Sequence, residues 1–518
     1  MAVAAPEAPP RRSVGLKIGV AAVVVIAAAA LRMAFLNYET GDGRIFLSWY
    51  DHIAQNGGFA ALKDISFANY NVTYLYILAA LSYLPVTPLI GIKIVSALFD
   101  FLLGWFVYRI VALRYPGKWW PVLAGTITLF LPTVVVNASM WGQADAMYAA
   151  FAVGGVYFIL RKRPWLACAF IGIAFALKLQ TVFLFPLLLI LVLRKGLPWK
   201  SLLAIPLVYV VLDIPALIIG TSVSQLVSVY VAQTGTFELL TLNAPNVYQY
   251  LGPSVTSSAL RIAGILLTGF LVLALVVAVW WRRVELSATR IILAATVSVL
   301  LVPYFLPAMH ERYFFLADAL TVVAAFYLPR KLWALPVLEQ FASFFAYLPF
   351  LIGAGGGGRG GGGFGGGAGG TGARPTLPPG GTGSGGAGGF PGGGAGGFPG
   401  GAGGGYGGGG FGGGTGRPGG GGGLGSGGFG GGGFGGGSVN PSFIDMRILA
   451  TAMLGALVLS IWVAVKEFRK PVLTDGDAAP PAQDPLPTSQ DAVATDSADQ
   501  QPVPVAPGSA DQDSASTP

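Results

Sequence analysis

Long apolar segments separated by short polar ones constrain this chain more than any other feature. Runs of roughly 20 apolar residues recur between residues 13 and 352 and again at 446–465, and about 20 such residues suffice to cross the hydrocarbon core of a bilayer. Only 10% of the 518 residues are charged, whereas soluble domains carry about 25%. The sequence therefore predicts an all-α polytopic membrane protein.

The apolar runs predict about twelve transmembrane helices. Two of them, 165–179 and 181–194, are short and suggest a re-entrant or tilted pair. A further run, 74–85, is too short to cross comfortably, so it predicts a helix that lies at the outer surface. The expected spans cover residues 13–36, 88–113, 119–138, 143–160, 165–179, 181–194, 201–220, 259–281, 290–306, 313–328, 333–352 and 446–465.

The positions of Lys and Arg predict the orientation of these helices. With the N-terminus inside, 20 of the 31 Lys and Arg residues fall in short cytoplasmic loops or at cytoplasmic helix ends, as the positive-inside rule requires. Both termini are then cytoplasmic, in a multi-pass protein of the cell (plasma) membrane. The excess of basic residues thus reflects topology, and no nucleic-acid partner is predicted. Arg11 and Arg12 before an Ala/Val run also resemble a signal peptide, but an uncleaved anchor fits the even number of spans better.

This topology places most of the unusual polar residues on the outer, non-cytoplasmic face. They occur in "NYETGDGRIFLSWYDHIAQNGG" after the first span, "NASMWGQADAM" after the third, "ALKLQTVF" in the short pair, "FELLTLNAPNVYQY" in the 221–257 loop, and "PAMHERYFF" before the tenth span. Ionisable groups at a bilayer edge are costly and usually functional. Each segment also has a structural alternative, as a turn, a helix cap, a snorkelling lysine or a belt of interfacial aromatics.

The order of these segments resembles the GT-C superfamily of integral-membrane glycosyltransferases, especially bacterial relatives of the polyprenyl-phosphate-dependent mannosyltransferases. The resemblance covers about residues 13–350 and rests on "MWGQADAM", "ALKLQ", "NAPNVY" and "MHERYFF" in this order. Proteins of this kind take a sugar from a polyprenyl-phosphate-sugar donor on the outer face and invert its anomeric centre. The resemblance implies transfer of a mannose-like hexose to a glycan, lipid or protein acceptor of the cell envelope.

The resemblance also implies roles for single residues. A carboxylate in the first outer loop is the general base of such enzymes, which indicates Asp42, with Glu39 as the alternative. The stretch "WGQAD" implies sugar or acceptor contacts for Gln143 and Asp145. Other candidates rest on charge and on the side of the membrane, and not on the resemblance. They are Arg312, Lys178, His310 and Arg44 for the donor phosphate, and Trp141, Gln180, Asn243, Asn246, Glu311 and Tyr313 for the sugar or acceptor.

One carboxylate and two cations are a sufficient set for this chemistry. The carboxylate removes the proton of the attacking hydroxyl, the sugar passes through an oxocarbenium-like state, and the cations stabilise the departing phosphate. Arg binds phosphate through a fork of donors, whereas Lys acts as a point charge. The scheme requires no metal or other cofactor, and one cysteine, Cys168, with two histidines argues against a metal site built from them.

The rest of the chain is of low complexity. Residues 353–440 are Gly-rich and predict a flexible outer linker, and the Pro/Ala/Asp-rich tail at 471–518 predicts disordered cytoplasmic chain. The expected organisation is an N-terminus at 1–12, a GT-C-like domain at 13–352, the linker, a last span at 446–465 and the tail. A twelve-span secondary transporter is the alternative function, although transporters place their binding groups near the midplane and show internal repeats.

Overall fold

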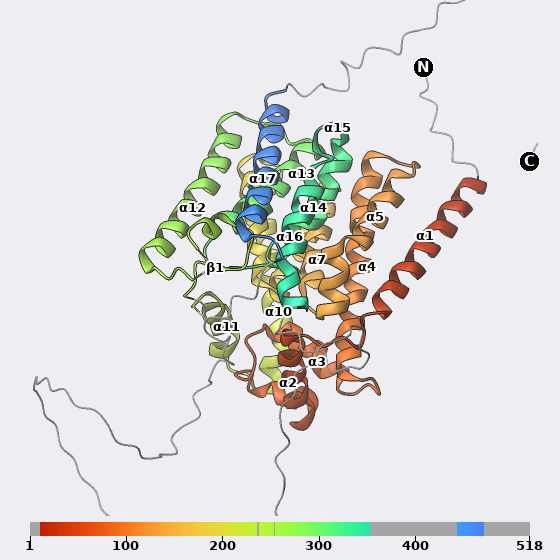
Figure 1. The fold of residues 1–518 in the computed structure, drawn as a ribbon, viewed down its shortest axis with the longest axis vertical. Coiled ribbons are helices and arrows are strands. Elements are labelled where there is room, and N and C mark those ends of the chain that lie inside the picture. The colour runs from red at the N-terminus through yellow and green to blue at the C-terminus, as the bar shows by residue number, and fades with distance from the viewer. Residues whose placement is uncertain (1–10, 236–237, 253, 353–442, 471–518) are drawn as a thin grey trace, which may run out of the picture.

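The structure is a computed structural model, and it describes residues 11–235, 238–252, 254–352 and 443–470. This part of the chain is almost entirely helical (Figure 1). The predicted linker at 353–440 and tail at 471–518 lie outside the described residues, as does most of the N-terminal segment. The elements are α1 (Arg11–Met33), α2 (Gly41–Gln55), η1 (Gly58–Lys63), α3 (Val72–Leu81), α4 (Pro88–Arg114), α5 (Trp120–Phe130), α6 (Pro132–Val135), η2 (Val136–Trp141), α7 (Asp145–Leu160), α8 (Pro164–Leu177), η3 (Leu179–Leu184), α9 (Phe185–Leu193), η4 (Trp199–Leu203), α10 (Ala204–Ile219), α11 (Val223–Gly235), β1 (Thr241–Leu242), η5 (Val247–Tyr250), α12 (Ser258–Trp281), α13 (Ala288–Phe305), β2 (Met309–His310), α14 (Phe315–Tyr327), α15 (Pro329–Leu332), α16 (Leu335–Ile352) and α17 (Met446–Phe468).

Seven helices among the described residues are long and apolar enough to cross a membrane, or eight if the bent pair of α5 with α6 and η2 forms one span. The seven are α1, α4, η4 with α10, α12, α13, α16 and α17. The other expected spans are the shorter apolar helices α7, α8, η3 with α9, and α14. Every segment that the sequence predicted to span is therefore helical, and the all-α polytopic fold is confirmed. The number of twelve spans stays a prediction.

The segment predicted as one span at 119–138 is bent by 54°. The bend lies at Leu131, whose extended backbone (φ −56°, ψ 129°) precedes Pro132, because a proline ring disfavours the helical conformation in the residue before it. The chain then winds into the π-helical turn η2, and Gly142, at a φ of 77°, ends it. A positive φ strains residues other than glycine. This turn brings Trp141 and the residues after it to one end of the helix bundle.

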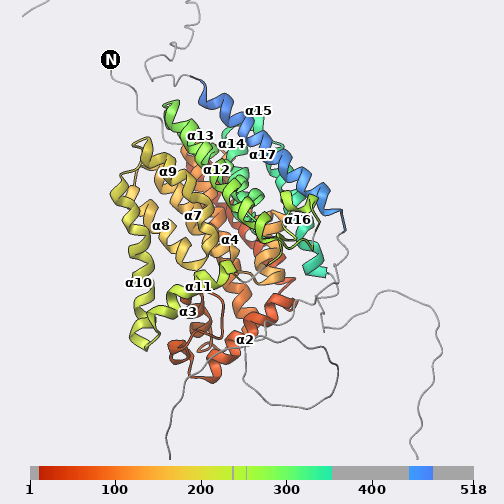
Figure 2. The same cartoon turned by 90° about the vertical axis from the view of Figure 1, so that its left-hand side faces the viewer.

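The bundle has two distinct ends (Figures 1 and 2). At one of them, called the site end here, α2 and α3 lie together. The loop 306–314 reaches this end through Arg312, whose Nη1 lies 3.5 Å from Asp42 Oδ2 of α2. The other, called the basic end, carries α15, the last turn of α17 and the connections 115–119, 161–163, 194–198 and 282–287. Lys331 of α15 and Glu467 of α17 form an ion pair there. Segments that the sequence assigned to one face thus meet at one end of the structure.

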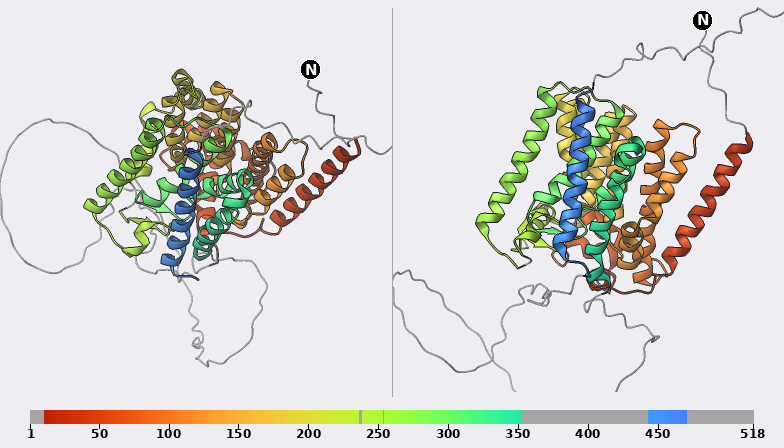
Figure 3. Two further views of the ribbon diagram at one scale, coloured as in Figure 1. Left: turned by 90° about the horizontal axis from the view of Figure 1, so that it is seen from above. Right: turned by 45° about the horizontal axis from the view of Figure 1, so that its top comes forward.

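Helix α1 lies at the periphery of the bundle (Figure 3), where it packs against α5 and η2. A buried ion pair holds its last turn: Arg32 Nε lies 2.8 Å from Asp100 Oδ2 of α4. Arg32 also donates hydrogen bonds to the backbone oxygens of Ala28 at 3.1 Å and Leu129 at 3.0 Å. The guanidinium therefore satisfies its donors inside the bundle, as a charge in an apolar environment must.

The prediction that 74–85 forms a helix at the outer surface is wrong in one respect. A helix does form there, as α3 at the site end, but its side chains are buried. Tyr74, Leu75 and Leu78 are completely inaccessible, and α3 packs against η1, α2, α4 and α10. The run is apolar on all sides, which is the pattern of a buried helix and not of an amphipathic one at an interface.

Candidate active site

Five ionisable side chains from four separate segments meet at the site end. They are Asp42 of α2, Asp145 of α7, Lys178 after α8, and Glu311 and Arg312 of the loop 306–314, and they are called the charged cluster here. Asp145 and Glu311 have side-chain exposures of 1% and 0%, whereas Asp42 is 22% exposed. Three carboxylates thus surround two cations, and only one of the carboxylates is accessible.

Asp42 is placed by the start of helix α2. Thr40 is the N-cap: its hydroxyl oxygen accepts a hydrogen bond from Gly43 N at 3.1 Å, the usual way to satisfy a helix's first amides. The same hydroxyl donates to the Trp141 backbone oxygen at 3.3 Å, which ties α2 to η2. Gln143 Nε2 then donates to Asp42 Oδ2 at 2.5 Å. The first outer loop and "WGQAD" therefore form one hydrogen-bonded unit.

Asp145 is the first residue of α7, and its side chain is 1% exposed. Its Oδ2 accepts a hydrogen bond from Asn137 Nδ2 at 2.9 Å, and its Oδ1 pairs with the Lys178 ammonium. Lys178 reaches this position because α8 ends before it and its backbone is extended (φ −156°, ψ 134°). The rings of Tyr70 and Tyr148 lie 5.8 and 5.9 Å from its nitrogen. Burial and pairing make Lys178 the counter-ion of Asp145.

A short parallel pairing of strands β1 and β2 presents the loop 306–314 to the cluster. Thr241 pairs with Met309 and Leu242 with His310, and Glu311 N donates to the Leu242 oxygen at 3.2 Å. Ala308, at a φ of 60°, makes the tight bend before the strand. Two loops that are far apart in sequence are therefore locked together, and the residues after His310 are held against the ends of α2 and α7.

Arg312 is the centre of the cluster. Its Nη1 lies 2.7 Å from Glu311 Oε1 and 3.5 Å from Asp42 Oδ2, and its Nε lies 3.9 Å from Asp145 Oδ2. The guanidinium also stacks 5.5 Å over the Trp141 ring. Burial opposes its charge, but the Asp42 and Glu311 carboxylates raise the pKa of Arg312 well above its ordinary value. The group is therefore a permanent cation, 14% exposed, at the mouth of the cluster.

Glu311 is fully buried beneath Arg312. Burial would raise the pKa of this carboxyl, but the Arg312 guanidinium and the His310 imidazole lower it below its ordinary value. His310 Nδ1 lies 3.6 Å from Glu311 Oε2. Glu311 is thus an ionised carboxylate that fixes Arg312 from below, rather than a group open to a substrate.

Residues 67–303 match the sequence model of glycosyltransferase family 87. That family consists of GT-C-type membrane glycosyltransferases. The resemblance to the GT-C superfamily is therefore confirmed, and the match covers Asp145 and Lys178 of the charged cluster. Asp42 and Arg312 lie outside the matched residues. No curated protein matches the chain.

The other predicted site residues fall into two groups. Some adjoin the charged cluster: Trp141 lies beneath Arg312, and the rings of His310 and Tyr313 lie 5.2 Å apart. Glu39 and Arg44 do not join it, because they face each other at 3.8 Å with exposures of 40% and 50%.

Three amide candidates have structural partners or positions of their own. Asn246 Oδ1 accepts from Tyr248 N at 3.2 Å and caps η5. Asn243 adopts a positive φ of 60° and bridges to His310 in the short sheet. Gln180 is buried in η3. Asn137 contacts Asp145 and was not among the predicted site residues, although it begins the stretch "NASMWGQADAM". The two residues are eight positions apart, and this spacing does not predict a contact unless the π-helical turn between them is known.

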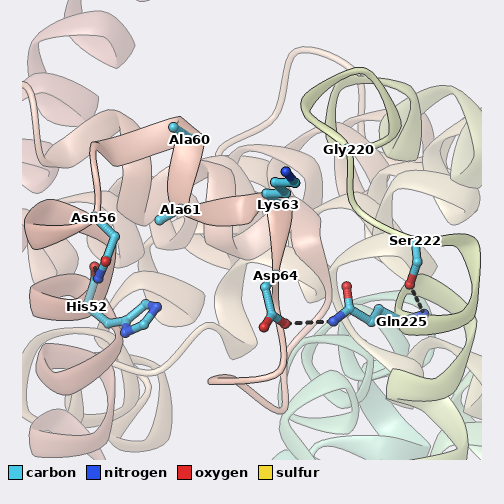
Figure 4. A pocket seen from close by; sticks show the side chains of 9 residues that line it. All are labelled: His52, Asn56, Ala60, Ala61, Lys63, Asp64, Gly220, Ser222 and Gln225. Carbon is cyan, nitrogen blue, oxygen red and sulfur yellow. Dashed lines mark hydrogen bonds between the residues drawn. The ribbon is translucent and has the colours of Figure 1, made fainter. Parts of the chain in front are cut away.

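A polar pocket also lies at the site end (Figure 4). It has a volume of about 540 Å³ and lies between α2, η1 and the start of α11, lined by His52, Asn56, Lys63, Asp64 and Gln225 among others. The backbone hydrogen bond from Ser66 holds the pKa of Asp64 below its usual range, and Gln225 Nε2 donates to Asp64 Oδ1 at 2.6 Å. No residue of the charged cluster lines this pocket. The charged cluster and this pocket are therefore separate sites.

Proposed function

We propose that this protein transfers a mannose-like hexose from a polyprenyl-phosphate-linked donor to a glycan, lipid or protein acceptor of the cell envelope, with inversion of the anomeric centre. The membrane glycosyltransferase family supports the reaction class. The observation that carries the mechanism is the charged cluster, in which one accessible carboxylate lies beside a permanent cation. The proposed partners are the lipid-linked donor, the acceptor and the bilayer.

Asp42 is the general base in this proposal. It has 22% side-chain exposure, whereas Asp145 and Glu311 are closed to any hydroxyl. The polar contacts that described residues make with its carboxylate, from Gln143 and Arg312, both reach Oδ2. We therefore assign Oδ1 to the acceptor hydroxyl, whose proton it removes as the oxygen attacks the sugar. Glu39, the alternative base, lies outside the cluster and pairs with Arg44.

Arg312 stabilises the departing phosphate. Glu311 and Asp42 hold the guanidinium in place through Nη1, so its other donors are preorganised for a phosphate that reaches the cluster. The buried Glu311 fixes one side of the guanidinium and the Trp141 ring fixes its face. The Lys178 ammonium is already paired with Asp145 and is 8% exposed. Lys178 therefore acts on the phosphate through its positive potential and not by direct contact. His310 adjoins this arrangement through Glu311.

The side of the membrane is proposed from the cations. The site end is non-cytoplasmic and both termini are cytoplasmic in the orientation that places short basic loops inside. Cysteine labelling tests this directly, since the chain has one cysteine, Cys168, which is buried. Lys63→Cys at the site end should react with an impermeant thiol reagent from outside intact cells, and Arg283→Cys at the basic end should not. The reverse labelling would refute the orientation.

The reaction itself is tested with the full-length protein in membranes. Radiolabelled polyprenyl-phosphate-mannose should supply label to a product that is stable to mild acid, and a nucleotide-linked mannose should not supply it once polyprenyl-phosphate-mannose synthesis is blocked. A transporter would instead move a sugar into sealed vesicles without forming a glycosidic bond. Uptake without product would therefore favour the transporter, and label from the nucleotide sugar alone would refute the proposed donor.

A further inference from the structure

A second cavity lies at the basic end, on the opposite side of the molecule from the charged cluster. It has a volume of about 580 Å³ and is formed where α4, α7 and α14 end. Its walls are of two kinds: the apolar side chains Leu113, Leu160 and Tyr327, and the cations Arg114, Arg161 and Lys162. None of the lining residues is acidic. This cavity is called the basic pocket here.

The structure positions one of these cations without neutralising it. The Arg114 guanidinium lies 5.4 Å from the Tyr327 ring centre and 5.5 Å from that of Tyr115. Its Nε donates to the Tyr115 hydroxyl at 3.3 Å, and the Tyr327 hydroxyl is anchored by donating to the Ile110 oxygen at 3.0 Å. Aromatic faces orient a guanidinium but leave its charge available. Arg114 is thus oriented for an anion that comes from outside the protein.

The carboxylates of Glu285 and Glu467, at this end of the described chain, do not line the basic pocket. Glu467 pairs with Lys331 and Lys470, whereas no ion pair with a described residue involves the three cations of the basic pocket. The positive-inside rule accounts for cations in short loops. It does not account for three cations from two helix ends converging on one cavity with apolar walls.

We propose that the basic pocket binds the phosphate headgroup of an anionic phospholipid. Helix α4 is one of the candidate spans and ends at Arg114, so the pocket lies at the depth of lipid headgroups, where basic pockets between helices recognise anionic lipids. The two Arg side chains and Lys162 hold the phosphate, and Leu113 and Leu160 contact the first acyl carbons. This binding is separate from sugar transfer and does not depend on the proposed function.

Native mass spectrometry of the full-length protein in detergent tests the proposal. The wild type should retain phosphatidylglycerol in preference to phosphatidylcholine. A pocket variant, Arg114→Gln with Arg161→Gln and Lys162→Gln, should weaken phosphatidylglycerol binding roughly 100-fold, because each cation near a lipid surface contributes a factor of about five. The matched control is Lys195→Gln with Lys200→Gln and Arg283→Gln, which removes the same charge from exposed sites at the same end. It should bind as the wild type does.

A second variant separates the cavity from its charge. Leu160→Trp fills the pocket and keeps all three cations, so it should also lose phosphatidylglycerol, and it remains informative if the triple variant does not fold. Equal losses in the pocket and control variants would show general attraction to basic residues and refute the site. Binding of inorganic phosphate that phosphatidylglycerol does not displace would assign the pocket to a soluble anion and refute the lipid.

Discussion

The two ends of the helix bundle carry cations in opposite circumstances. At the site end Lys178 and Arg312 are 8% and 14% exposed and lie against buried carboxylates. At the basic end the cations outnumber the acids, and the ion pairs of the described chain there involve Glu467, whose partners Lys331 and Lys470 are 35% and 55% exposed. The charged cluster therefore differs from the basic end in the burial of its cations and in its several carboxylates, and not in a larger number of cations.

The same contrast separates the two pockets. The pocket in Figure 4 combines Lys63 with Asp64 and the amides of Asn56 and Gln225, so its charges balance. The basic pocket has three cations and no acid. A balanced polar surface suits neutral ligands, whereas an unbalanced one suits anions. Neither pocket contains the charged cluster, where partners within the protein already occupy most of the polar groups.

The largest effect is expected at the accessible carboxylate. Asp42→Asn keeps the shape of the side chain and removes the base, so we expect transfer to fall by about 100- to 10,000-fold. Initial rates from the radiolabelled donor, in membranes with matched protein levels, measure the loss. Glu39→Gln should retain transfer, because Glu39 lies with Arg44 outside the cluster. Loss of activity in Glu39→Gln with near-normal Asp42→Asn would move the base to Glu39, and activity in both would refute the mechanism.

A large effect on stability is expected at the buried pair. Lys178→Met leaves the Asp145 carboxylate, with 1% side-chain exposure, without its closest cation, and breaking a buried pair costs about 3–5 kcal/mol. The free energy of unfolding in detergent, followed by tryptophan fluorescence, measures this cost. Asp145→Asn combined with Lys178→Met removes both charges and should recover most of the loss. If Lys178→Met alone were as stable as the wild type, the Asp145 carboxylate would not need Lys178 as its counter-ion.

An intermediate effect is expected at the mouth of the cluster. Arg312→Lys keeps the charge and loses the forked donors, so donor binding should weaken by about 1.5–3 kcal/mol. The donor concentration for half-maximal transfer gives this change, with Arg283→Lys at the basic end as the control. If both Arg312→Lys and Arg312→Gln kept the wild-type donor dependence, Arg312 would be an interfacial anchor and not a phosphate ligand.

The sequence predicted the helical framework well, because apolar runs of membrane length have few other outcomes. It also predicted which segments would share one end, since alternating basic loops determine the direction of each helix. Three details were not accessible. The burial of α3 depends on which helices surround it, the size of the bend that Pro132 causes at Leu131 depends on the packing of the chain after it, and Arg32 has a partner 68 residues away in Asp100.

The structure brings some of the predicted site residues together and leaves others apart, and their roles stay predictions. Ionisable residues in a polar stretch beside a span were correctly expected to gather, because a bilayer edge tolerates them only with partners. The pairing itself was not predictable: Lys178 lies against Asp145, because α8 ends one residue before it. Its expected role at the donor phosphate stays a prediction. Likewise Asn246 caps a 3₁₀ turn through its side-chain oxygen Oδ1, as short polar side chains commonly do.

The smallest effect is expected at the basic end. It tests whether burial is the reason why ion pairs at the two ends contribute differently to stability. Lys331→Ala removes one of the two partners of Glu467, but Lys470 stays within 2.8 Å of the same carboxylate. Since exposed pairs contribute about 0–1 kcal/mol, the free energy of unfolding should change by no more than that, and sugar transfer should not change. The measurement is the same detergent unfolding experiment as for Lys178→Met, run side by side. If Lys331→Ala lowered the free energy of unfolding as much as Lys178→Met, burial would not be the reason why an ion pair stabilises one end more than the other.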